Sequence, residues 1–501
     1  MRRTDQLIEA LHGARCYPHT VGVIDVRQTH VSWVVLTGEF AYKIKKPVKL
    51  KFLDFSSLPL RRHYCELELK LNRRFAPELY LDVVAIRGSV QSPTIDECST
   101  GSSAEEPIEY AVKLRQFDAG CELTHLLENN AASDAELAAL GRHLARVHAA
   151  APRCDEFGSA DQSARIAADN MREIEELASQ HVETTRIRAW LKETFERLHE
   201  VLQKRQNEGR VRECHGDLHA GNIVSWQGRL LPFDCLEFDA KLRCIDVVND
   251  VAFLAMDLAA RGHSRLTYVF VNAWLEECGD YEGVKVLRVF QVHRAMVRAK
   301  VALLEKKEAL TRNYLRVAQR LCAPAQPLLL ITCGLSGSGK TWLSTRLLAE
   351  LGAIRIRSDV ERKRLAGLKA DESSSAAGLD IYTADYHERV YARLLQCARI
   401  ALEAGETVIV DAAFLKRAER AMFTDLGREL AVPMKILHCV AGDTELRRRL
   451  RHRSAEGKDA SEADVAIMEQ QIRWWEPFSD EEKPYVVSGT TEQLAGEALR
   501  V

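Results

Sequence analysis

The sequence predicts a two-domain protein, in which an N-terminal α+β domain precedes a C-terminal α/β domain built on a parallel sheet. Three observations lead to this prediction. The chain has 501 residues, more than one hydrophobic core usually organises. Strand-like segments dominate the first part of the chain and helical periodicity follows them. After residue 327, short apolar segments alternate with helical ones. The composition, 46% hydrophobic and 28% charged, is typical of folded domains and not of disordered chains.

The N-terminal domain, residues 1–322, begins with short segments that have β-strand character. They are residues 21–26, 31–36, 40–44, 80–86 and 110–115. Helical periodicity then covers residues 122–150 and 163–207. Strands first and helices later predict a small β-rich lobe followed by a larger helical lobe.

A linker separates the domains at residues 323–327, where Pro324 and Pro327 fix φ and remove backbone donors. In the C-terminal domain, residues 328–501, five strand-like segments are separated mostly by helical stretches. They are residues 328–332, 353–356, 407–410, 434–440 and 485–487. This alternation predicts a parallel sheet covered by helices on both faces.

Charge and cysteine content narrow the classes of function. The net charge is −2, from 70 basic and 72 acidic residues, which argues against general binding to nucleic acid or to an anionic membrane. The 13 cysteines include no CxxC pair, as expected for free thiols in a reducing compartment. The N-terminus lacks an apolar signal core, and the apolar run at 251–256 is too short to span a bilayer. We therefore expect a cytoplasmic protein.

A glycine-rich motif follows the first strand of the C-terminal domain and matches GxxxxGK[ST] in full. It consists of Gly334, Leu335, Ser336, Gly337, Ser338, Gly339, Lys340 and Thr341. In such a loop the backbone N–H groups turn toward phosphates, and the N-terminus of the next helix favours negative charge. Lys340 is expected to reach the β- and γ-phosphates of ATP, and Thr341 to ligate Mg²⁺.

Other charged residues follow the later strands of this domain. Asp359 and Arg362 come after the second strand, where an acid could accept a hydroxyl proton and an arginine could hold a phosphate. The alternative is an N-capping aspartate with a surface arginine. Asp411 ends an apolar strand and is a candidate Mg²⁺ ligand. Arg449 and Arg453 share one helix face, which suits either a phosphate clamp or a solvated basic surface.

Together these residues resemble the small P-loop kinases that include zeta toxins, gluconate kinases and polynucleotide kinases, over roughly residues 328–501. The resemblance implies that Asp359 is the general base and that Arg362 contacts the substrate. It also implies that Arg449 and Arg453 belong to a lid. It does not identify the acceptor.

The N-terminal domain carries a second motif, HGDLHAGN at 215–222, with Asp217 and Asn222 five residues apart. Asp234 follows seventeen residues after Asp217, directly after an apolar segment. This pattern resembles the aminoglycoside phosphotransferases within the protein-kinase-like fold, over about residues 20–320. The resemblance implies Asp217 as the acceptor base and Asn222 and Asp234 as metal ligands. The alternative is a capped loop around a buried, hydrogen-bonded aspartate.

A kinase-like lobe also needs a lysine on its third strand. Ala41 and Lys43 share one strand face, and a small residue two positions before a lysine leaves room for a nucleotide base. We therefore favour Lys43 over Lys45, with Glu68 as its partner and Glu66 as a close second. A solvated lysine-rich strand edge is the alternative. No GxGxxG loop precedes this strand, so this half lacks the usual glycine-rich phosphate loop.

The whole arrangement resembles bacterial fusions of an aminoglycoside phosphotransferase domain with an AAA-type ATPase domain. The leading hypothesis is a kinase that uses ATP and Mg²⁺ to phosphorylate hydroxyl groups of a small polar molecule. One alternative is a regulatory module that binds and hydrolyses ATP. Another is a kinase of RNA or DNA terminal hydroxyls, against which the near-neutral charge argues.

Overall fold

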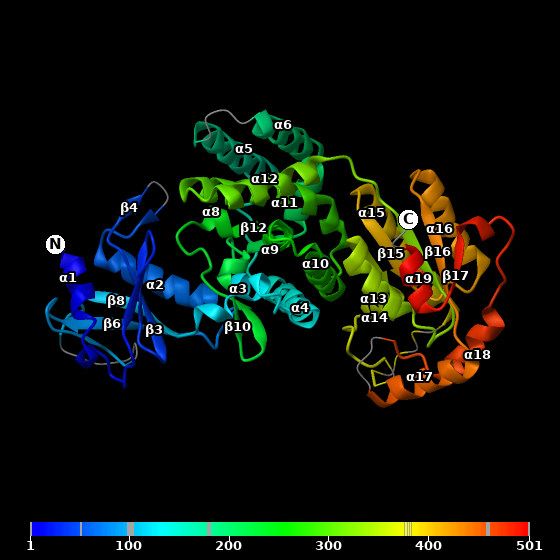
Figure 1. Cartoon of the computed structure of the whole chain (residues 1–501), viewed down its shortest axis with the longest axis horizontal. Coiled ribbons are helices and arrows are strands. Elements are labelled where there is room, and N and C mark those ends of the chain that lie inside the picture. The colour runs from blue at the N-terminus through cyan, green and yellow to red at the C-terminus, as the bar shows by residue number, and fades with distance from the viewer. Residues whose placement is uncertain are drawn as a thin grey trace. The chain divides into compact units, whose positions relative to one another are not determined.

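The computed structural model describes residues 3–50, 53–97, 105–177, 182–374, 376–377, 379, 381, 383–456 and 461–498. Backbone packing divides the chain into two compact units. The first comprises Met1–Ala132, Ala150–Gln162 and Gln203–Asp250; the second comprises Ser133–Ala149, Ser163–Leu202 and Val251–Val501. Many elements of each unit are labelled in Figure 1.

The first unit is built on a six-stranded antiparallel sheet with the order β1-β2-β3-β8-β6-β7. Its strands are β1 (Asp25–Gln28), β2 (Ser32–Leu36), β3 (Phe40–Lys45), β6 (Tyr80–Gly88), β7 (Pro93–Ile95) and β8 (Glu109–Arg115). The five strands expected from the sequence all occur. The first is displaced toward Gln28, because residues 21–24 lie outside the ladder and Val23 is 90% exposed.

Helices cover both faces of this sheet. Tyr42 and Ile44 point into the cluster formed with α1 (Arg3–Ala10). Ala41 points to the other face, where α2 (Leu58–Asn72) packs. Helix α2 begins after Ser57, whose side chain caps it, and has a proline in its first turn. The period of two therefore directs Lys43 and Lys45 toward α2.

Smaller elements of the first unit surround the HGDLHAGN segment. They are β4 (Lys49–Leu50), β5 (Leu53–Asp54), α3 (Leu123–Glu128), β9 (Val211–Glu213), β10 (Ile223–Trp226), β11 (Arg229–Pro232), α8 (Ala240–Arg243) and β12 (Cys244–Asp246). Strands β10 and β11 form an antiparallel hairpin, and β9 pairs with β12. The hairpin brings its two ends together, because the N–H of Phe233 donates to the carbonyl of Asn222 at 2.9 Å. Asp234 thereby follows directly on the residue paired with Asn222.

The second unit begins with a helical region. Its helices are α4 (Asp134–Ala150), α5 (Ala160–Leu177), α6 (Val182–Arg197), α9 (Val247–Ala260), α10 (Ser264–Cys278), α11 (Val284–Leu304) and α12 (Glu308–Cys322). Helix α7 (His199–Asn207) contains the chain boundary between the two units, which follows Leu202. The apolar run at 251–256 belongs to α9 and is buried. Among the described residues, no helix combines the length and the apolar character that crossing a membrane requires.

The second unit also contains a five-stranded parallel sheet with the order β14-β15-β13-β16-β17. Its strands are β13 (Leu329–Cys333), β14 (Ala353–Arg357), β15 (Thr407–Asp411), β16 (Met434–Cys439) and β17 (Val486–Gly489). Its helices are α13 (Lys340–Leu351), α14 (Ser358–Leu365), α15 (Ala384–Glu403), α16 (Arg417–Glu429), α17 (Asp443–Glu456), α18 (Val465–Trp474) and α19 (Thr491–Ala498). Leu330 packs against α13 and α19, and its neighbour Ile331 is also fully buried. Both faces of the sheet are therefore covered, which confirms the predicted parallel α/β fold.

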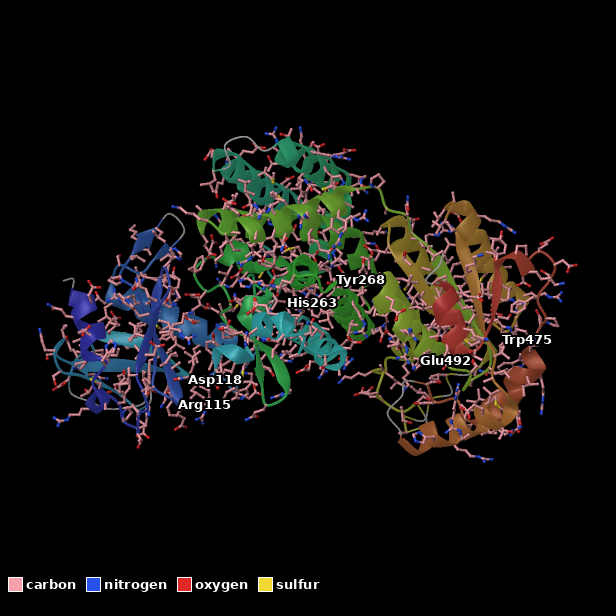
Figure 2. The ribbon with its side chains drawn as sticks, in the orientation of Figure 1. Arg115, Asp118, His263, Tyr268, Trp475 and Glu492 are labelled. Atoms are coloured by element: carbon pink, nitrogen blue, oxygen red, sulfur yellow. The ribbon has the colours of Figure 1, made fainter. Side chains whose placement is uncertain are left out.

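Helix α10 covers the edge of this sheet that is formed by β14. The side chain of Asn272 donates to the carbonyl of Ala353 at 2.8 Å and accepts from the N–H of Arg355 at 2.6 Å. It therefore takes the place of a neighbouring strand along β14. One turn earlier, the ring of Tyr268 (Figure 2) lies so close to Gly352 that a Cβ atom there would be 2.7 Å from it. An edge strand left open would expose unpaired backbone groups.

Candidate active sites

The glycine-rich loop joins β13 to α13 in the conformation that the motif predicts. Gly334, Gly337 and Gly339 have φ angles of 137°, 85° and 95°, which other residues adopt only with strain. A Cβ atom on Gly339 would also lie 2.7 Å from Cγ2 of Thr491. Helix α13 begins at Lys340, so the loop ends at a helix N-terminus, where backbone N–H groups and the helix dipole favour an anion.

A cavity of about 430 Å³ opens beside this loop. Lys340 lines it and donates to the carbonyls of Gly334 and Leu335, both at 2.9 Å. Burial lowers the pKa of Lys340, although the nearby carboxylate of Asp411 favours the charged ammonium. Asp411 lines the same cavity together with Thr341. These oxygen donors are of the kind that Mg²⁺ prefers.

Asp411 is fixed by a residue that the sequence analysis did not identify. The hydroxyl of Ser344, one turn into α13, donates to Oδ2 of Asp411 at 2.9 Å. The two residues are 67 positions apart, so no local pattern pairs them. The sequence nevertheless contains a signal, because Ser344 shares the buried face of α13 with Leu347 and Leu348. A hydroxyl buried on such a face needs a hydrogen-bond partner.

Asp359 and Arg362 both line the cavity at the start of α14. Asp359 is not the N-cap of this helix, because the N-cap is Arg357 and it carries no side-chain capping bond. Arg362 is buried and donates to the carbonyl of Ile381 at 3.0 Å. The alternative of a capping aspartate with a surface arginine is therefore wrong.

The proposed lid is only partly described. Arg449 on α17 lines the cavity, pairs with Glu445 at 2.6 Å and lies 3.3 Å from the carbonyl of Gly337. The side chain of Arg453 lies outside the described part of the chain. From α18, the side-chain oxygen of Gln471 accepts the N–H of Ser336 at 2.7 Å, so a second helix also touches the loop.

A histidine and a glutamate lie on the cavity wall that also carries Asp359. Nε2 of His387 is 2.7 Å from Oε1 of Glu419, and both residues line the cavity. They belong to α15 and α16, 32 positions apart, and the sequence analysis identified neither. Gly334, Leu335 and Ser338 line a second, smaller cavity of about 240 Å³ together with His438 and Trp475, whose rings stack.

In the first unit, the predicted lysine and its partners meet. Nζ of Lys43 lies 2.8 Å from Oε1 of Glu68 and 2.5 Å from Oδ1 of Asp234. Burial alone would lower the pKa of Lys43, but the surrounding carboxylates raise it well above its usual value. Glu66 is half-exposed and pairs with Arg62, so Glu68 is the partner of Lys43.

The lysine that we ranked second is not a solvated edge residue. Lys45 is fully buried, donates to Oε2 of Glu68 at 2.8 Å and also pairs with Glu237. Each carboxylate oxygen of Glu68 therefore binds a different lysine. Burial raises the pKa of the Glu237 carboxyl, whereas Lys43 and Lys45 outweigh burial at Glu68 and lower its pKa. The sequence analysis missed this second ion pair.

Asp217 lies beside Asn222, whose side-chain nitrogen donates to its backbone oxygen and to Oδ2, each at 3.0 Å. Its side chain is 31% exposed, so Asp217 is not the buried aspartate of the alternative interpretation. That structural role belongs to Asp250, which accepts the N–H groups of His215 and Gly216 at 3.0 Å. The structure thus leaves the carboxylate of Asp217 accessible.

The backbone of Asp234 has a φ of 63°, which is unusual for a residue other than glycine. Its N–H donates to the phenolic oxygen of Tyr80 at 3.0 Å. Its side chain contacts Lys43, and 45% of that side chain is exposed. Such outliers concentrate at functional sites.

The connection between β1 and β2 is short. Thr29 and Ser32 close it through an N–H to carbonyl bond of 2.9 Å, and the hydroxyl of Thr29 accepts the N–H of Ser32 at 3.0 Å. A tight turn of this kind has no spare length with which to cover a triphosphate. The structure therefore agrees with the absence of a GxGxxG motif.

Two segments of the chain match known families. Residues 80–287 match the phosphotransferase enzyme family, and residues 329–478 match an AAA domain. The chain combines these two domains. The phosphotransferase match includes Asp217, Asn222 and Asp234, and begins after Lys43 and Glu68.

Relatives share the whole arrangement. The chain is 29% identical to the uncharacterized proteins Rv2004c of Mycobacterium tuberculosis and Mb2027c of Mycobacterium bovis, over 493 residues that cover 95% of this chain and 95% of each relative. Among solved structures, a choline/ethanolamine kinase family protein from Mesorhizobium loti is 10% identical, with a TM-score of 0.39, and covers 64% of this chain and 94% of its own. A gluconokinase from Sinorhizobium meliloti is 18% identical, with a TM-score of 0.27, and covers 35% of this chain and 91% of its own.

Proposed function

We propose that the protein is an ATP- and Mg²⁺-dependent phosphotransferase that acts on a hydroxyl group of a small polar molecule. One observation carries the proposal. In the C-terminal half, Lys340, Asp411 and Asp359 line one cavity. In the N-terminal half, contacts link Lys43 to Asp234 and Asn222 to Asp217. These are the parts that phosphoryl transfer requires.

In the AAA domain, Lys340 and the loop amides bind the phosphates, while Thr341 and Asp411 hold Mg²⁺. Asp359 accepts the proton of the acceptor hydroxyl as its oxygen attacks the γ-phosphorus and the bond to ADP breaks. Asp359 and Lys340 line one cavity, so an acceptor can reach a bound nucleotide. Arg362 and Arg449 add positive charge where the transferred group carries negative charge.

In the phosphotransferase-family domain, Lys43 binds phosphates, Asn222 and Asp234 hold Mg²⁺, and Asp217 is the acceptor base. The ion pair between Lys43 and Glu68 supports this assignment, because it orients the ammonium group toward Asp234. Asp217 and Asp234 keep exposed carboxylate surface, as ligand-binding groups must.

A second candidate function is regulatory binding of ATP by one half without transfer to a small molecule. In this candidate the AAA domain binds and hydrolyses ATP to switch the phosphotransferase-family domain. The short connection from Thr29 to Ser32 favours it, because a turn of this length provides no loop to cover a triphosphate in the phosphotransferase-family domain. The two functions make different products. A regulatory module releases inorganic phosphate only, whereas a kinase makes a phosphorylated acceptor.

The test is to incubate the full chain with γ-labelled Mg-ATP and a pool of small polar metabolites, and to search for labelled products by mass spectrometry. A short oligonucleotide with free terminal hydroxyls forms a separate arm. A labelled small molecule whose formation requires Asp217 or Asp359 supports the proposal and identifies the responsible domain. Turnover of ATP to ADP and phosphate alone, across the whole pool, would contradict it.

A further inference from the structure

A carboxylate from the phosphotransferase-family part of the chain reaches the strand that follows the P-loop helix. Glu276 lies on α10, and its Oε1 accepts from Nε and Nη2 of Arg355 at 2.9 and 2.7 Å. Its Oε2 lies 4.0 Å from Nη1 of Arg357. Both arginines belong to β14, the edge strand that α10 covers. The three side chains are between 9% and 16% exposed, so their charges are only weakly screened.

The same two arginines also lie near Asp411, the acid that is proposed to hold Mg²⁺. Nε of Arg357 lies 3.9 Å from Oδ2 of Asp411. Nη1 of Arg355 lies 3.4 Å from the hydroxyl of Ser344, which in turn donates to Oδ2 of Asp411. Two routes therefore connect Glu276 with one oxygen of Asp411, the first through Arg357 and the second through Arg355 and Ser344.

Arg357 stands between two carboxylates at nearly equal distances, 3.9 Å from Asp411 and 4.0 Å from Glu276. A guanidinium paired with Asp411 competes with a metal cation for that carboxylate. Glu276 attracts the same guanidinium in the opposite direction. The charge on Glu276 therefore affects how fully Asp411 is available to a metal.

We propose that Glu276 is a positioning residue for the metal site of the AAA domain, and that it acts by holding Arg357 away from Asp411. The phosphotransferase-family part of the chain thus supplies a component of the neighbouring domain's site. This inference rests on the proposed function, because it requires that the P-loop binds Mg-ATP. It explains why α10 directs a carboxylate at an arginine pair on the sheet edge.

The test compares Glu276→Gln with the parent in the full chain, in a Lys43→Met background that removes phosphate binding by the other site. ATP binding is measured by calorimetry over a range of Mg²⁺ concentrations and again in EDTA. In Glu276→Gln, we expect the Mg²⁺ concentration for half-maximal ATP binding to rise about tenfold, while affinity in EDTA stays the same. A purely structural role would change both measurements or neither.

Two further variants make the test specific. Glu277→Gln removes a carboxylate from the adjacent position of α10, where it pairs with Arg146 at 3.1 Å, and should leave the Mg²⁺ dependence unchanged. Adding Arg357→Met to Glu276→Gln should restore the parental dependence, because the competing guanidinium is gone. Glu276→Asp keeps the negative charge, so its Mg²⁺ dependence of ATP binding should stay close to that of the parent.

The inference is overturned if Glu276→Gln needs no more Mg²⁺ than the parent, or if Arg357→Met fails to restore the double variant. A parent that binds Mg-ATP normally while these outcomes occur leaves the proposed function standing. If the parent in the Lys43→Met background binds no Mg-ATP at all, the proposed P-loop site is wrong and this inference falls with it.

Discussion

Replacing Lys340 by methionine should remove nucleotide from the P-loop site without unfolding the domain. The ammonium makes two hydrogen bonds, both to carbonyls of its own loop. With ATP bound, we expect these donors to turn to phosphate oxygens as charge-assisted bonds, each worth about 1.5–3 kcal/mol. Losing two of them costs roughly 3–6 kcal/mol, which raises the dissociation constant of ATP about 10²- to 10⁴-fold.

Calorimetry on the full chain provides the assay. If both halves bind Mg-ATP, the parent titrates with two sites and Lys340→Met with one, and Lys43→Met removes the other. Methionine matches the length of the lysine stem, so the thermal unfolding temperature should hardly change. Unchanged affinity and stoichiometry in Lys340→Met would refute the assignment of the loop as a phosphate site.

The lowered pKa of Lys340 also gives this site a pH dependence. Burial disfavours the ammonium of Lys340, and phosphates would favour it, so ATP binding takes up a proton once Lys340 has begun to deprotonate. ATP affinity should therefore be constant at low pH and fall as the pH rises through the lowered pKa. Lys340→Arg keeps its charge and should show no such fall in the same range.

Four other substitutions test separate parts of the structure. Asn272→Ala leaves two buried backbone groups of β14 without their side-chain partner. It should lower the free energy of unfolding, measured in urea, by about 2–5 kcal/mol. A loss below about 0.5 kcal/mol would contradict the role of α10 as a cover for the β14 edge. Asp217→Asn should keep nucleotide affinity and lose transfer, whereas Asp234→Asn should weaken Mg-ATP binding itself, as binding and turnover assays can distinguish. Asp359→Asn should reduce transfer to an identified acceptor by ~10²–10⁴-fold at nearly constant ATP affinity, and near-normal transfer would remove it from the mechanism.

The sequence was sufficient for the parts of both sites that form local patterns. The loop from Gly334 to Thr341 could be predicted because one short segment contains its glycines, its lysine and its helix start. Lys43 could be chosen over Lys45 because Ala41, a small residue, lies two positions before Lys43 on the same strand face. The same rule also placed Lys45 on that face, and only its burial against Glu68 and Glu237 shows that both lysines are paired.

The parts that escaped prediction depend on contacts between distant segments. Ser344 with Asp411, His387 with Glu419, and the ion pair of Lys45 with Glu237 each join residues more than thirty positions apart. Nothing in the residues near either partner identifies the other. The Asp359 alternative failed for a different reason, since helix α14 starts two residues earlier than the capping interpretation required.

Helix α10 shows how such contacts could still be anticipated in kind. Tyr268, Asn272 and Glu276 are spaced four apart, so they form a polar stripe on one face of the helix. Each proves to bind the AAA domain: Tyr268 contacts Glu406, Asn272 satisfies the edge of β14, and Glu276 holds the arginine pair. A stripe of hydrogen-bonding groups on a helix of a packed unit must find partners, because burying them unpaired costs free energy. The sequence therefore indicates that α10 docks on a polar surface, but only the fold identifies that surface as the sheet edge beside the P-loop.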